Sequence, residues 1–270
     1  MTDYQPKPKK EDIDARHSDR GGIAGFLETI LRRMRLGTSL FALALLYIIM
    51  ILMMSVSLTP GIYWFHFILK RTAEWSDLIR YGALAFGVIS GYFLYGISII
   101  FVAPLFNFLM PFRLKPFRGI YYSLGSVPWY FHNAFTYVVR YTFLEFFTPS
   151  PLNLLFYRLM GMKMGRGCQI NTTNISDPAL IELGDKVTIA GSATIFGHYA
   201  SQGYLVVEKV KIGSGVTIGL KATVMGDVEI GDGAVIAPHE VVYPKSRIPA
   251  GRRPAVQNNQ ESGTNLPQAS

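Results

Sequence analysis

Histidine is the residue type in this sequence best suited to proton transfer, because a neutral imidazole titrates near physiological pH and accepts a proton from a hydroxyl or an amine. The chain has five histidines. His198 lies in a stretch that interrupts a repeating pattern, whereas His239 lies inside the pattern and is expected at the surface. His198 is therefore the candidate general base, although an exposed loop histidine without a catalytic role fits the same position.

A polar cluster precedes His198 in the segment INTTNISD, which holds Asn171, Asn174 and Asp177. Asn and Asp side chains commonly cap turns by bonding to the backbone, and this explains most such clusters. As a functional alternative, Asn174 or Asp177 could approach the histidine of a neighbouring copy and orient its imidazole, or bind an amine substrate. The sequence leaves both readings open.

The elements that must position these residues follow a period of six. The repeating aliphatic positions are Val206, Ile212, Ile218, Val224, Ile230, Ile236 and Val242. A period of six fits neither a helix of 3.6 residues per turn nor a two-residue strand alternation. It is typical of a solenoid in which short strands are joined by tight corners, with one aliphatic side chain per repeat facing inward.

An earlier run keeps the same period at Leu183, Ile189 and Ile195. The phase breaks twice, at residues 171–181 and at residues 197–205. An off-phase insertion must leave the solenoid wall, because it would otherwise rotate every later aliphatic residue out of the core. We therefore expect residues 197–205 to form a loop that carries His198 outside the wall.

These repeats make the sequence similar to the hexapeptide-repeat acyltransferases, whose fold is a left-handed parallel β-helix with about three hexapeptides per coil. Residues from Pro149 onward resemble, more narrowly, the membrane-linked hexapeptide-repeat domain at the end of ε-poly-L-lysine synthetase and related amino-acid-adenylating enzymes. The resemblance implies that aliphatic residues of successive coils stack on one another. The stacked pairs would be Ile212 with Ile230, Ile218 with Ile236, and Val224 with Val242.

The resemblance also implies an activity and the residues that carry it. Hexapeptide transferases are usually trimers with active sites between neighbouring prisms, and the histidine after the AGSATIFG segment, His198, matches the family's general base. The donor, acyl-CoA or another acyl thioester, would lie along a groove and leave after reaction. The positions that carry over to the donor site are Gly219, Leu220, Lys221, Ala222, Ala237, Pro238 and Arg252. The tryptophan that closes the pattern in many relatives is missing.

Two alternatives assign different roles to the same residues. A metal-dependent hydratase resembling the γ-class carbonic anhydrases needs three histidines between subunits, and the solenoid offers only His198 and His239, so we expect no metal site. A non-catalytic membrane scaffold for a carrier-protein or adenylating enzyme would need neither histidine as a base. Our leading hypothesis is a membrane-embedded transferase that moves an acyl or aminoacyl group from a thioester to a hydroxyl or amine of an amphipathic or lipid-linked acceptor.

Half of the 270 residues are apolar and 16% are charged, a composition too apolar for a wholly soluble protein. Two uncharged stretches, residues 39–58 and 81–102, are long enough to cross a hydrocarbon core of about 30 Å. Residues 59–80 are mixed and aromatic and suit the opposite membrane interface. Gly87 and Gly91 in the second stretch would let another helix approach closely.

Residues 126–147 are apolar and aromatic but interrupted by polar side chains. These are His132, Asn133, Arg140 and Glu145. The segment fits an interfacial or re-entrant helix with His132 as an anchor, or a third membrane span. Basic residues at 32–35 and 113–118 flank the two spans, so two crossings return the chain to the cytoplasmic side. We therefore predict an interfacial or re-entrant helix and a multi-pass protein of the bacterial inner membrane, with the transferase domain in the cytoplasm.

The chain is expected to have four parts. They are a disordered basic arm (1–36), a membrane domain (37–148), a β-helix (149–250) and a flexible tail (251–270). A single cysteine, Cys168, excludes an internal disulfide and fits a reducing compartment. The net charge of +8 is scattered, without an aromatic-interleaved basic motif, so no nucleic-acid partner is expected. The expected partners are further copies of the chain in a homotrimer, membrane lipids, and a carrier-protein or adenylating enzyme.

Overall fold

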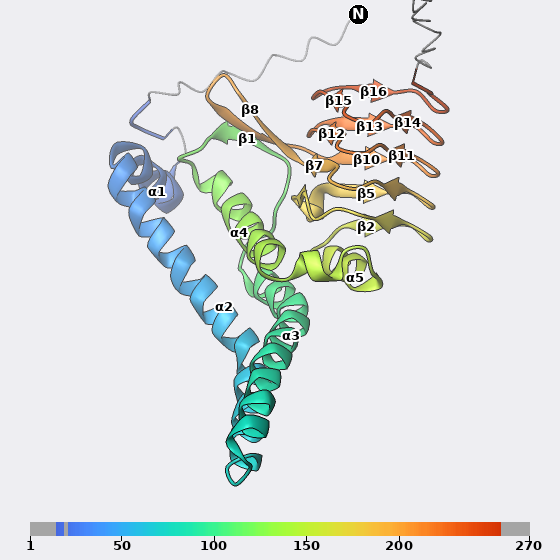
Figure 1. Cartoon of the computed structure of the whole chain (residues 1–270). Helices are drawn as coiled ribbons and strands as arrows, with labels where there is room; N and C mark the ends of the chain where they lie inside the picture. Colours follow the sequence, from blue (N-terminus) through green and yellow to red (C-terminus); the bar gives the residue numbers. More distant parts are fainter. Residues whose placement is uncertain (1–14, 19–20, 255–270) are drawn as a thin grey trace, which may run out of the picture.

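The computed structural model of the chain describes residues 15–18 and 21–254 and shows a helical part followed by a stack of short strands (Figure 1). Residues 1–14 and 19–20 of the predicted arm and residues 255–270 of the predicted tail lie outside the described residues. The α-helices are α1 (Gly22–Arg33), α2 (Arg35–Arg71), α3 (Asp77–Leu109), α4 (Val127–Thr142) and α5 (Pro151–Leu159). Three short 3₁₀ helices are η1 (Leu124–Ser126), η2 (Leu144–Phe147) and η3 (Pro178–Leu180).

Helix α1 corrects the prediction of a disordered arm up to residue 36. Its sequence, GIAGFLETILRR, is amphipathic, and Arg32 Nη2 lies 2.7 Å from Glu28 Oε1 one turn earlier. Opposite charges four residues apart on a helix stabilise it. Residues 22–33 therefore form a helix, although they carry charges of both signs.

Helices α2 and α3 are both long and apolar enough, by length and composition, to cross a membrane (Leu40–Arg71 and Asp77–Leu109). They are longer than predicted, because the helix continues through Pro60 and only residues 72–76 link it to α3. Residues 59–80, predicted to suit the opposite membrane interface, include the end of α2 and the link to α3, and their position in a membrane stays a prediction. Proline removes one backbone donor, and an apolar helix tolerates this loss when its other backbone groups stay paired.

The two long helices contact each other at glycine residues. A Cβ atom added to Gly91 would lie 3.1 Å from the backbone oxygen of Gly61, and one added to Gly87 would lie 3.2 Å from the side chains of Phe65 and Ile68. Trp64 Nε1 donates a hydrogen bond of 2.6 Å to Ser90 Oγ near the same crossing. The predicted close approach at Gly87 and Gly91 is confirmed.

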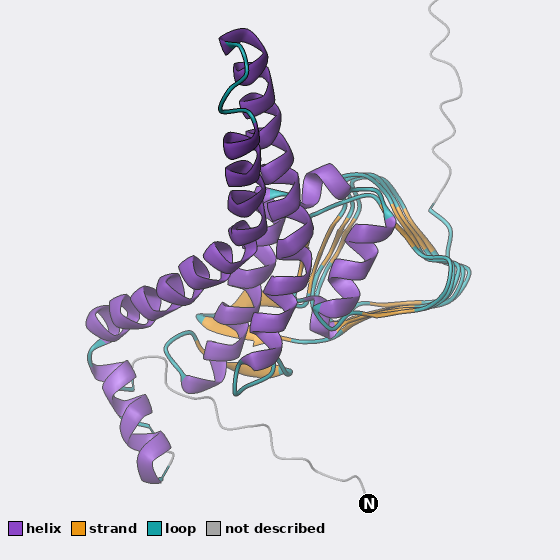
Figure 2. Ribbon diagram, turned by 90° about the horizontal axis from the view of Figure 1, so that it is seen from below, coloured by secondary structure: helices purple, strands orange, loops and turns teal. Residues whose placement is uncertain are grey.

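The strands that follow α5 form three parallel sheets, and the chain visits the sheets in the same order on each coil. The first sheet contains β2 (Lys163–Met164), β5 (Ile181–Leu183), β10 (Val210–Ile212), β13 (Val228–Ile230) and β16 (Arg247–Ile248). The second contains β3 (Gln169–Ile170), β6 (Thr188–Ile189), β11 (Thr217–Ile218) and β14 (Val235–Ile236). The third contains β4 (Ile175–Ser176), β7 (Thr194–Phe196), β12 (Thr223–Val224) and β15 (Val241–Val242). Figure 2 shows these sheets as the three sides of a triangular stack.

The aliphatic residues of the hexapeptides stack as predicted. The observed partners are Ile212 with Ile230, Ile218 with Ile236, and Val224 with Val242. These side chains face the interior, and Ile218, Val224 and Ile236 are fully buried. The parallel solenoid is confirmed, and its left-handed sense stays a prediction. Val206 is an exception, because it belongs to an inserted hairpin and pairs with Arg118.

The insertion at residues 197–205 leaves the solenoid wall, as predicted, and forms a β-hairpin. Strands β8 (His198–Ser201) and β9 (Tyr204–Val207) pair through a turn in which Gln202 and Gly203 both have positive φ, at 50° and 81°. Such a turn matches the twist of a hairpin. Strand β1 (Phe117–Ile120), which follows α3, completes an antiparallel sheet in the order β1-β9-β8 and so pairs with the hairpin inserted in the solenoid.

Helix α4 packs against α3 and the solenoid strand β4. With 16 residues it is shorter than the roughly 20 needed to span a bilayer. Two of the polar residues that suggested an interfacial helix contact the solenoid: Arg140 donates a hydrogen bond to Asn174 Oδ1, and Glu145 accepts one from the Thr173 hydroxyl. Burial of a polar side chain requires such partners.

Candidate active site

The side chains of Asp177 and His198 meet where the two phase breaks of the solenoid adjoin. Asp177 Oδ2 lies 2.5 Å from His198 Nδ1 and accepts a hydrogen bond of 3.0 Å from the backbone N–H of Gly197. Asp177 is fully buried, whereas the His198 side chain is 23% exposed. An ionised carboxylate only accepts hydrogen bonds, so Nδ1 carries the proton in the neutral ring. His198 Nε2 therefore has a lone pair that can accept a proton.

One of the two readings of the polar cluster had Asn174 or Asp177 approach the histidine of a neighbouring copy, whereas the structure places Asp177 beside the histidine of its own chain. The residue begins η3 with a left-handed backbone at φ 57°. Aspartate tolerates this conformation better than most residues. The off-phase segment thus turns the Asp177 carboxylate toward Gly197 and His198.

Aromatic rings enclose the imidazole of His198. The ring centroid of Trp129 lies 5.0 Å away at an interplanar angle of 72°, and that of Phe196 lies 5.4 Å away. Trp129 comes from α4 and Phe196 from β7. The helical part and the solenoid therefore both limit how the imidazole can turn.

Asn133 on α4 is the site residue that sequence reasoning missed. Its Nδ2 donates a hydrogen bond of 2.6 Å to Asp177 Oδ1, and the side chain is 5% exposed. Both carboxylate oxygens of Asp177 are therefore occupied by donors before any substrate binds. A signal was present in the sequence, because an asparagine inside an apolar helix needs a polar partner.

His132, next to Asn133, is not a second base. Its side chain is 2% exposed, and Nδ1 lies 3.1 Å from Asn107 Oδ1 on α3. Burial lowers the pKa of His132 to about 4, although the nearby Asp177 carboxylate acts in the opposite direction. The ring is therefore neutral at physiological pH, and the prediction that it anchors the chain in the membrane interface was wrong.

The other two polar candidates lie away from the imidazole of the same chain. Asn174 accepts a hydrogen bond from Arg140. Asn171 is exposed at the corner after β3, where its backbone N–H donates to Ile189 O at 2.9 Å. Their proposed contacts with an amine substrate stay predictions.

The geometry of the solenoid agrees with a comparison against known families. A family model described as "Bacterial transferase hexapeptide (six repeats)" matches residues 209–239, which contain the stacked strands β10 to β14. Within the solenoid, residues 209–239 therefore match the hexapeptide repeat of bacterial transferases. The repeat predicted from the six-residue period is confirmed over these residues.

Similarity to other proteins is more distant. Delta-poly-L-ornithine synthetase from Acinetobacter baumannii (strain AB307-0294) is 20% identical over 163 residues, which cover 58% of this chain but only 12% of the relative. A hexapeptide-repeat-containing acetyltransferase structure from Vibrio cholerae is 15% identical, covers 44% of this chain and 82% of its own, and has a TM-score of 0.35. Serine acetyltransferase from Neisseria gonorrhoeae is 20% identical, with coverages of 71% and 79% and a TM-score of 0.29.

The predicted donor-binding residues gather at one corner of the hexapeptide domain, between the second and third sheets. Gly219, Lys221 and Ala222 lie between β11 and β12, and Ala237 lies directly above them after β14. Arg252 Nη1 approaches the same corner and lies 2.8 Å from Glu240 Oε2. His198 follows β7 at the next corner, between the third and first sheets, so one chain does not bring the donor residues to its own histidine.

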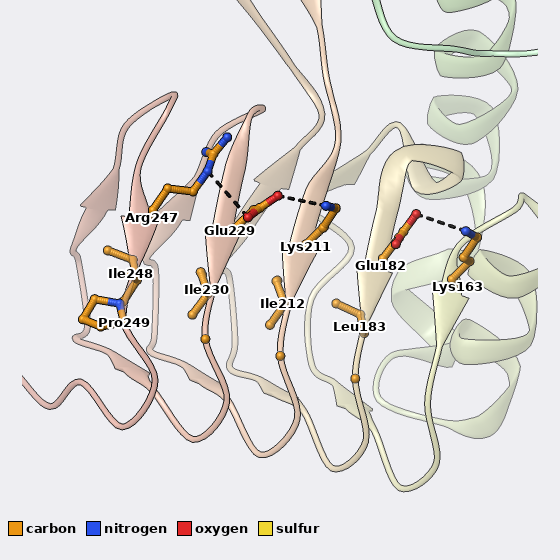
Figure 3. Close-up of a pocket in the computed structure, with 13 residues that line it drawn as sticks. Lys163, Glu182, Leu183, Lys211, Ile212, Glu229, Ile230, Arg247, Ile248 and Pro249 are labelled. Atoms are coloured by element: carbon orange, nitrogen blue, oxygen red, sulfur yellow. Dashed lines mark hydrogen bonds and ion pairs between the residues drawn. The ribbon is translucent and has the colours of Figure 1, made fainter.

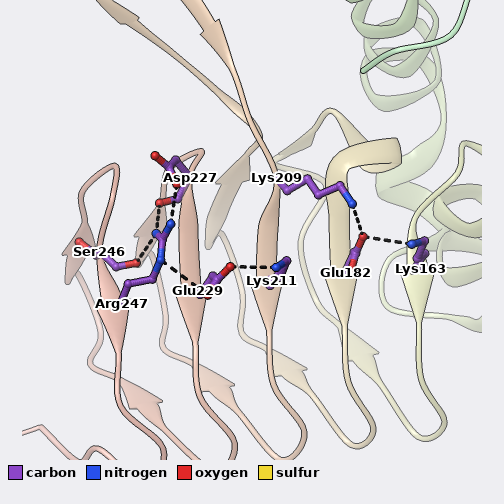
Figure 4. A network of polar contacts seen from close by, with 8 residues as sticks. All are labelled: Lys163, Glu182, Lys209, Lys211, Asp227, Glu229, Ser246 and Arg247. Carbon is purple, nitrogen blue, oxygen red and sulfur yellow. Dashed lines mark hydrogen bonds and ion pairs between the residues drawn. The ribbon is translucent and has the colours of Figure 1, made fainter. Parts of the chain in front are cut away.

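A groove of about 620 Å³ on the first sheet of the hexapeptide domain contains no candidate catalyst (Figure 3). Its charged residues are paired along the strands: Lys163 with Glu182 at 3.1 Å and Lys211 with Glu229 at 2.9 Å. Figure 4 shows the network continuing to Arg247, which bonds to Asp227. Alternating, paired charges do not favour a charged ligand, and exposed pairs of this kind stabilise little. Within the described ranges, no group of three or more His, Cys, Asp or Glu residues could hold a metal ion.

Proposed function

We propose that the protein is a membrane-bound acyltransferase in which His198 is the general base. The observation that supports this proposal is the buried Asp177 carboxylate at His198 Nδ1. It sets the tautomer of the ring and stabilises the imidazolium that forms during proton transfer. Nε2 is then the atom that receives the proton, in a partly open position beside Trp129.

In the proposed reaction, His198 Nε2 takes a proton from the hydroxyl or amine of the acceptor while that oxygen or nitrogen attacks a thioester carbonyl. The new C–O or C–N bond forms, the C–S bond breaks, and the imidazolium returns its proton to the leaving thiolate. An acyl or aminoacyl group is transferred in either case. Asn133 keeps the Asp177 carboxylate in place through its hydrogen bond to Oδ1.

Acyl-CoA or another acyl thioester is the proposed donor, and a homotrimer is the proposed assembly. Gly219 to Ala222 and Ala237 lie one corner away from His198 within a chain. A neighbouring copy can bring its own donor corner to that histidine, and closed three-fold symmetry would repeat the arrangement at each interface. Lys221 and Arg252 are the proposed phosphate contacts.

The acceptor is proposed to be amphipathic or linked to a lipid. Two long apolar helices project from the solenoid (Figure 1). Arg32 and Arg33 precede α2 at the end of α1, and basic residues at 113–118 follow α3. We therefore propose that α2 and α3 cross the bacterial inner membrane and that the hexapeptide domain lies on the cytoplasmic side. The site would then act on a molecule held at the membrane surface.

The test of the proposed base uses the purified full chain in detergent micelles. Isotope-labelled acetyl-CoA and palmitoyl-CoA are the donors, and a bacterial lipid extract and free diamines are the acceptors. His198→Ala is expected to lower the rate of label transfer by about 10²–10⁴-fold. His66→Ala, an exposed histidine of α2 near its link to α3, is expected to keep the wild-type rate. Full turnover by His198→Ala would refute the assignment, and a wild-type chain without any turnover would favour the scaffold alternative.

A further inference from the structure

A cavity of about 230 Å³ lies between the start of the long apolar helices and the segment that leads into α4. Its walls include Leu31 of α1, Ala42, Leu43 and Leu46 of α2, and Tyr121 and Phe131 near the start of α4. No charged residue of the described chain lines it. Such an uncharged, mostly apolar lining suits an uncharged, apolar ligand.

The cavity adjoins the part of α2 that is proposed to lie in the membrane. Ala42, Leu43 and Leu46 belong to the candidate span Leu40–Arg71, close to its first residue. In Figure 1 the start of α2 is at the solenoid end of the helical part, and the link between α2 and α3 is at the far end. A lipid chain can therefore enter the cavity from the side of the bilayer nearest the candidate active site.

A short series of aromatic contacts joins the cavity to the imidazole. The ring of Tyr121, in the cavity wall, lies 6.4 Å from that of Trp129, and Trp129 lies 5.0 Å from His198. Trp129 Nε1 is buried and has no hydrogen-bond partner among the described residues. One ring, that of Trp129, therefore separates the cavity wall at Tyr121 from the imidazole of His198.

The cavity also has one polar position that lacks a partner. Ser123 is 4% exposed, and its hydroxyl makes no hydrogen bond within the described residues. Nearby Ser126 differs, because its hydroxyl donates to Tyr121 O and Ser123 O. A buried hydroxyl without a partner is costly unless a bound group satisfies it. An ester or hydroxyl oxygen near the polar end of a lipid chain would do so.

We propose that this cavity binds one alkyl chain of a lipid acceptor and thereby presents the acceptor's reacting hydroxyl or amine to His198. The proposal rests on the proposed transferase function. The volume is below the range of about 300–1,000 Å³ typical of pockets for drug-sized ligands, which favours one chain over a ring system. We assign the chain to the acceptor rather than to the thioester, because the proposed donor residues lie at a different corner of the solenoid.

The test measures binding separately from turnover. The full chain is placed in lipid nanodiscs that contain a phosphatidylethanolamine with a photoreactive diazirine on one alkyl chain, and cross-linked peptides are identified by mass spectrometry. Cross-links are expected in residues 121–131. Ala42→Trp fills the cavity and is expected to lower them at least tenfold, whereas Ala44→Trp, an exposed position of the same helix outside the lining, is expected to leave them unchanged. Cross-links to α3 in the same sample serve as the reference for general lipid contact.

Several outcomes would overturn the proposal. Equal labelling of residues 121–131 in Ala42→Trp and Ala44→Trp would do so. Preferential labelling by diazirine-bearing palmitoyl-CoA would also do so, because it would assign the alkyl chain in the cavity to the donor.

If Ala42→Trp does not fold, Val127→Phe fills the cavity from the opposite wall and is expected to give the same loss of cross-links. His198→Ala is expected to keep wild-type labelling. Labelling without turnover in the wild type would therefore count against the proposed function and not against the cavity.

Discussion

The wall of the solenoid and the contact between Asp177 and His198 show two different ways in which this chain uses its repeats. Each regular hexapeptide buries an aliphatic side chain such as Ile218, and its polar groups point to solvent or to paired neighbours. The candidate site forms only where the repeat is interrupted, at η3 and at the β8–β9 hairpin. Regular repeats therefore bury the aliphatic core, and the interruptions bring together the candidate catalytic groups.

The largest expected effect on stability comes from the regular wall. Ile218 is fully buried between Ile189 and Ile236, so Ile218→Ala is expected to lower the free energy of unfolding by about 2–5 kcal/mol. Turnover per folded molecule should change little, because Ile218 does not touch the hairpin. Chemical denaturation and an activity assay check both points. Leu205→Ala, at a fully buried position of the hairpin, should instead reduce turnover. Equal effects of the two variants on turnover would contradict the separate roles of the regular wall and the hairpin.

A pH effect of similar size is expected from the helix that packs on the site. His132 has a pKa of about 4 in the folded chain and about 6.5 when unfolded, so the unfolded state binds more protons between these values. Stability is therefore present above pH 6.5 and is expected to fall by roughly 3 kcal/mol as the pH drops to 4. His132→Gln should remove most of this dependence. The measurement is the denaturation midpoint at several pH values from 4.5 to 7. If the midpoint of His132→Gln changes with pH as much as that of the wild type, the pH dependence does not come from His132.

A smaller effect on the rate is expected from Asn133. Asn133→Ala leaves Asp177 Oδ1 buried without its donor, and kcat is expected to fall about tenfold with little change in KM. Asn153→Ala is the matched control, because Asn153 is also fully buried and bonds to Ile170 O, away from the imidazole. Both variants should lose stability. Only Asn133→Ala should lose turnover, and a similar loss in the control would make the role of Asn133 purely structural.

The smallest effect is expected from the charged network on the first sheet. Lys211 and Glu229 form an exposed pair, and such pairs contribute little because water and salt screen them. Lys211→Ala should leave both the melting temperature and the rate of acyl transfer within experimental error. Loss of transfer in this variant would show that the groove in Figure 3 takes part in the reaction.

The six-residue period was sufficient to predict the register of the wall, because each inward aliphatic residue must lie above the one before it. His198 and Asp177 were also found from the sequence, as residues at the two places where that period fails. The pairing of β1 with the hairpin was not predicted. Its four residues, Phe117–Ile120, carry no signal for a partner some ninety positions later in the chain, and strand pairing over such a separation depends on the whole fold.

The position of α4 was missed for a different reason. A helix face that contacts protein and a face that contacts lipid are both apolar, so hydrophobicity alone does not distinguish them. Asn133 and Arg140 did hold the information, because each needed a polar partner within the fold. We interpreted them as interfacial residues, and their partners are on the solenoid.

A double-mutant cycle on the rate of acyl transfer tests the central claim, that Asp177 and His198 act as one unit. The four proteins are the wild type, Asp177→Asn, His198→Ala and the variant with both substitutions. If Asp177 acts only through the imidazole, each single substitution lowers kcat strongly and the double variant is no slower than His198→Ala. Independent effects that multiply in the double variant would contradict this account.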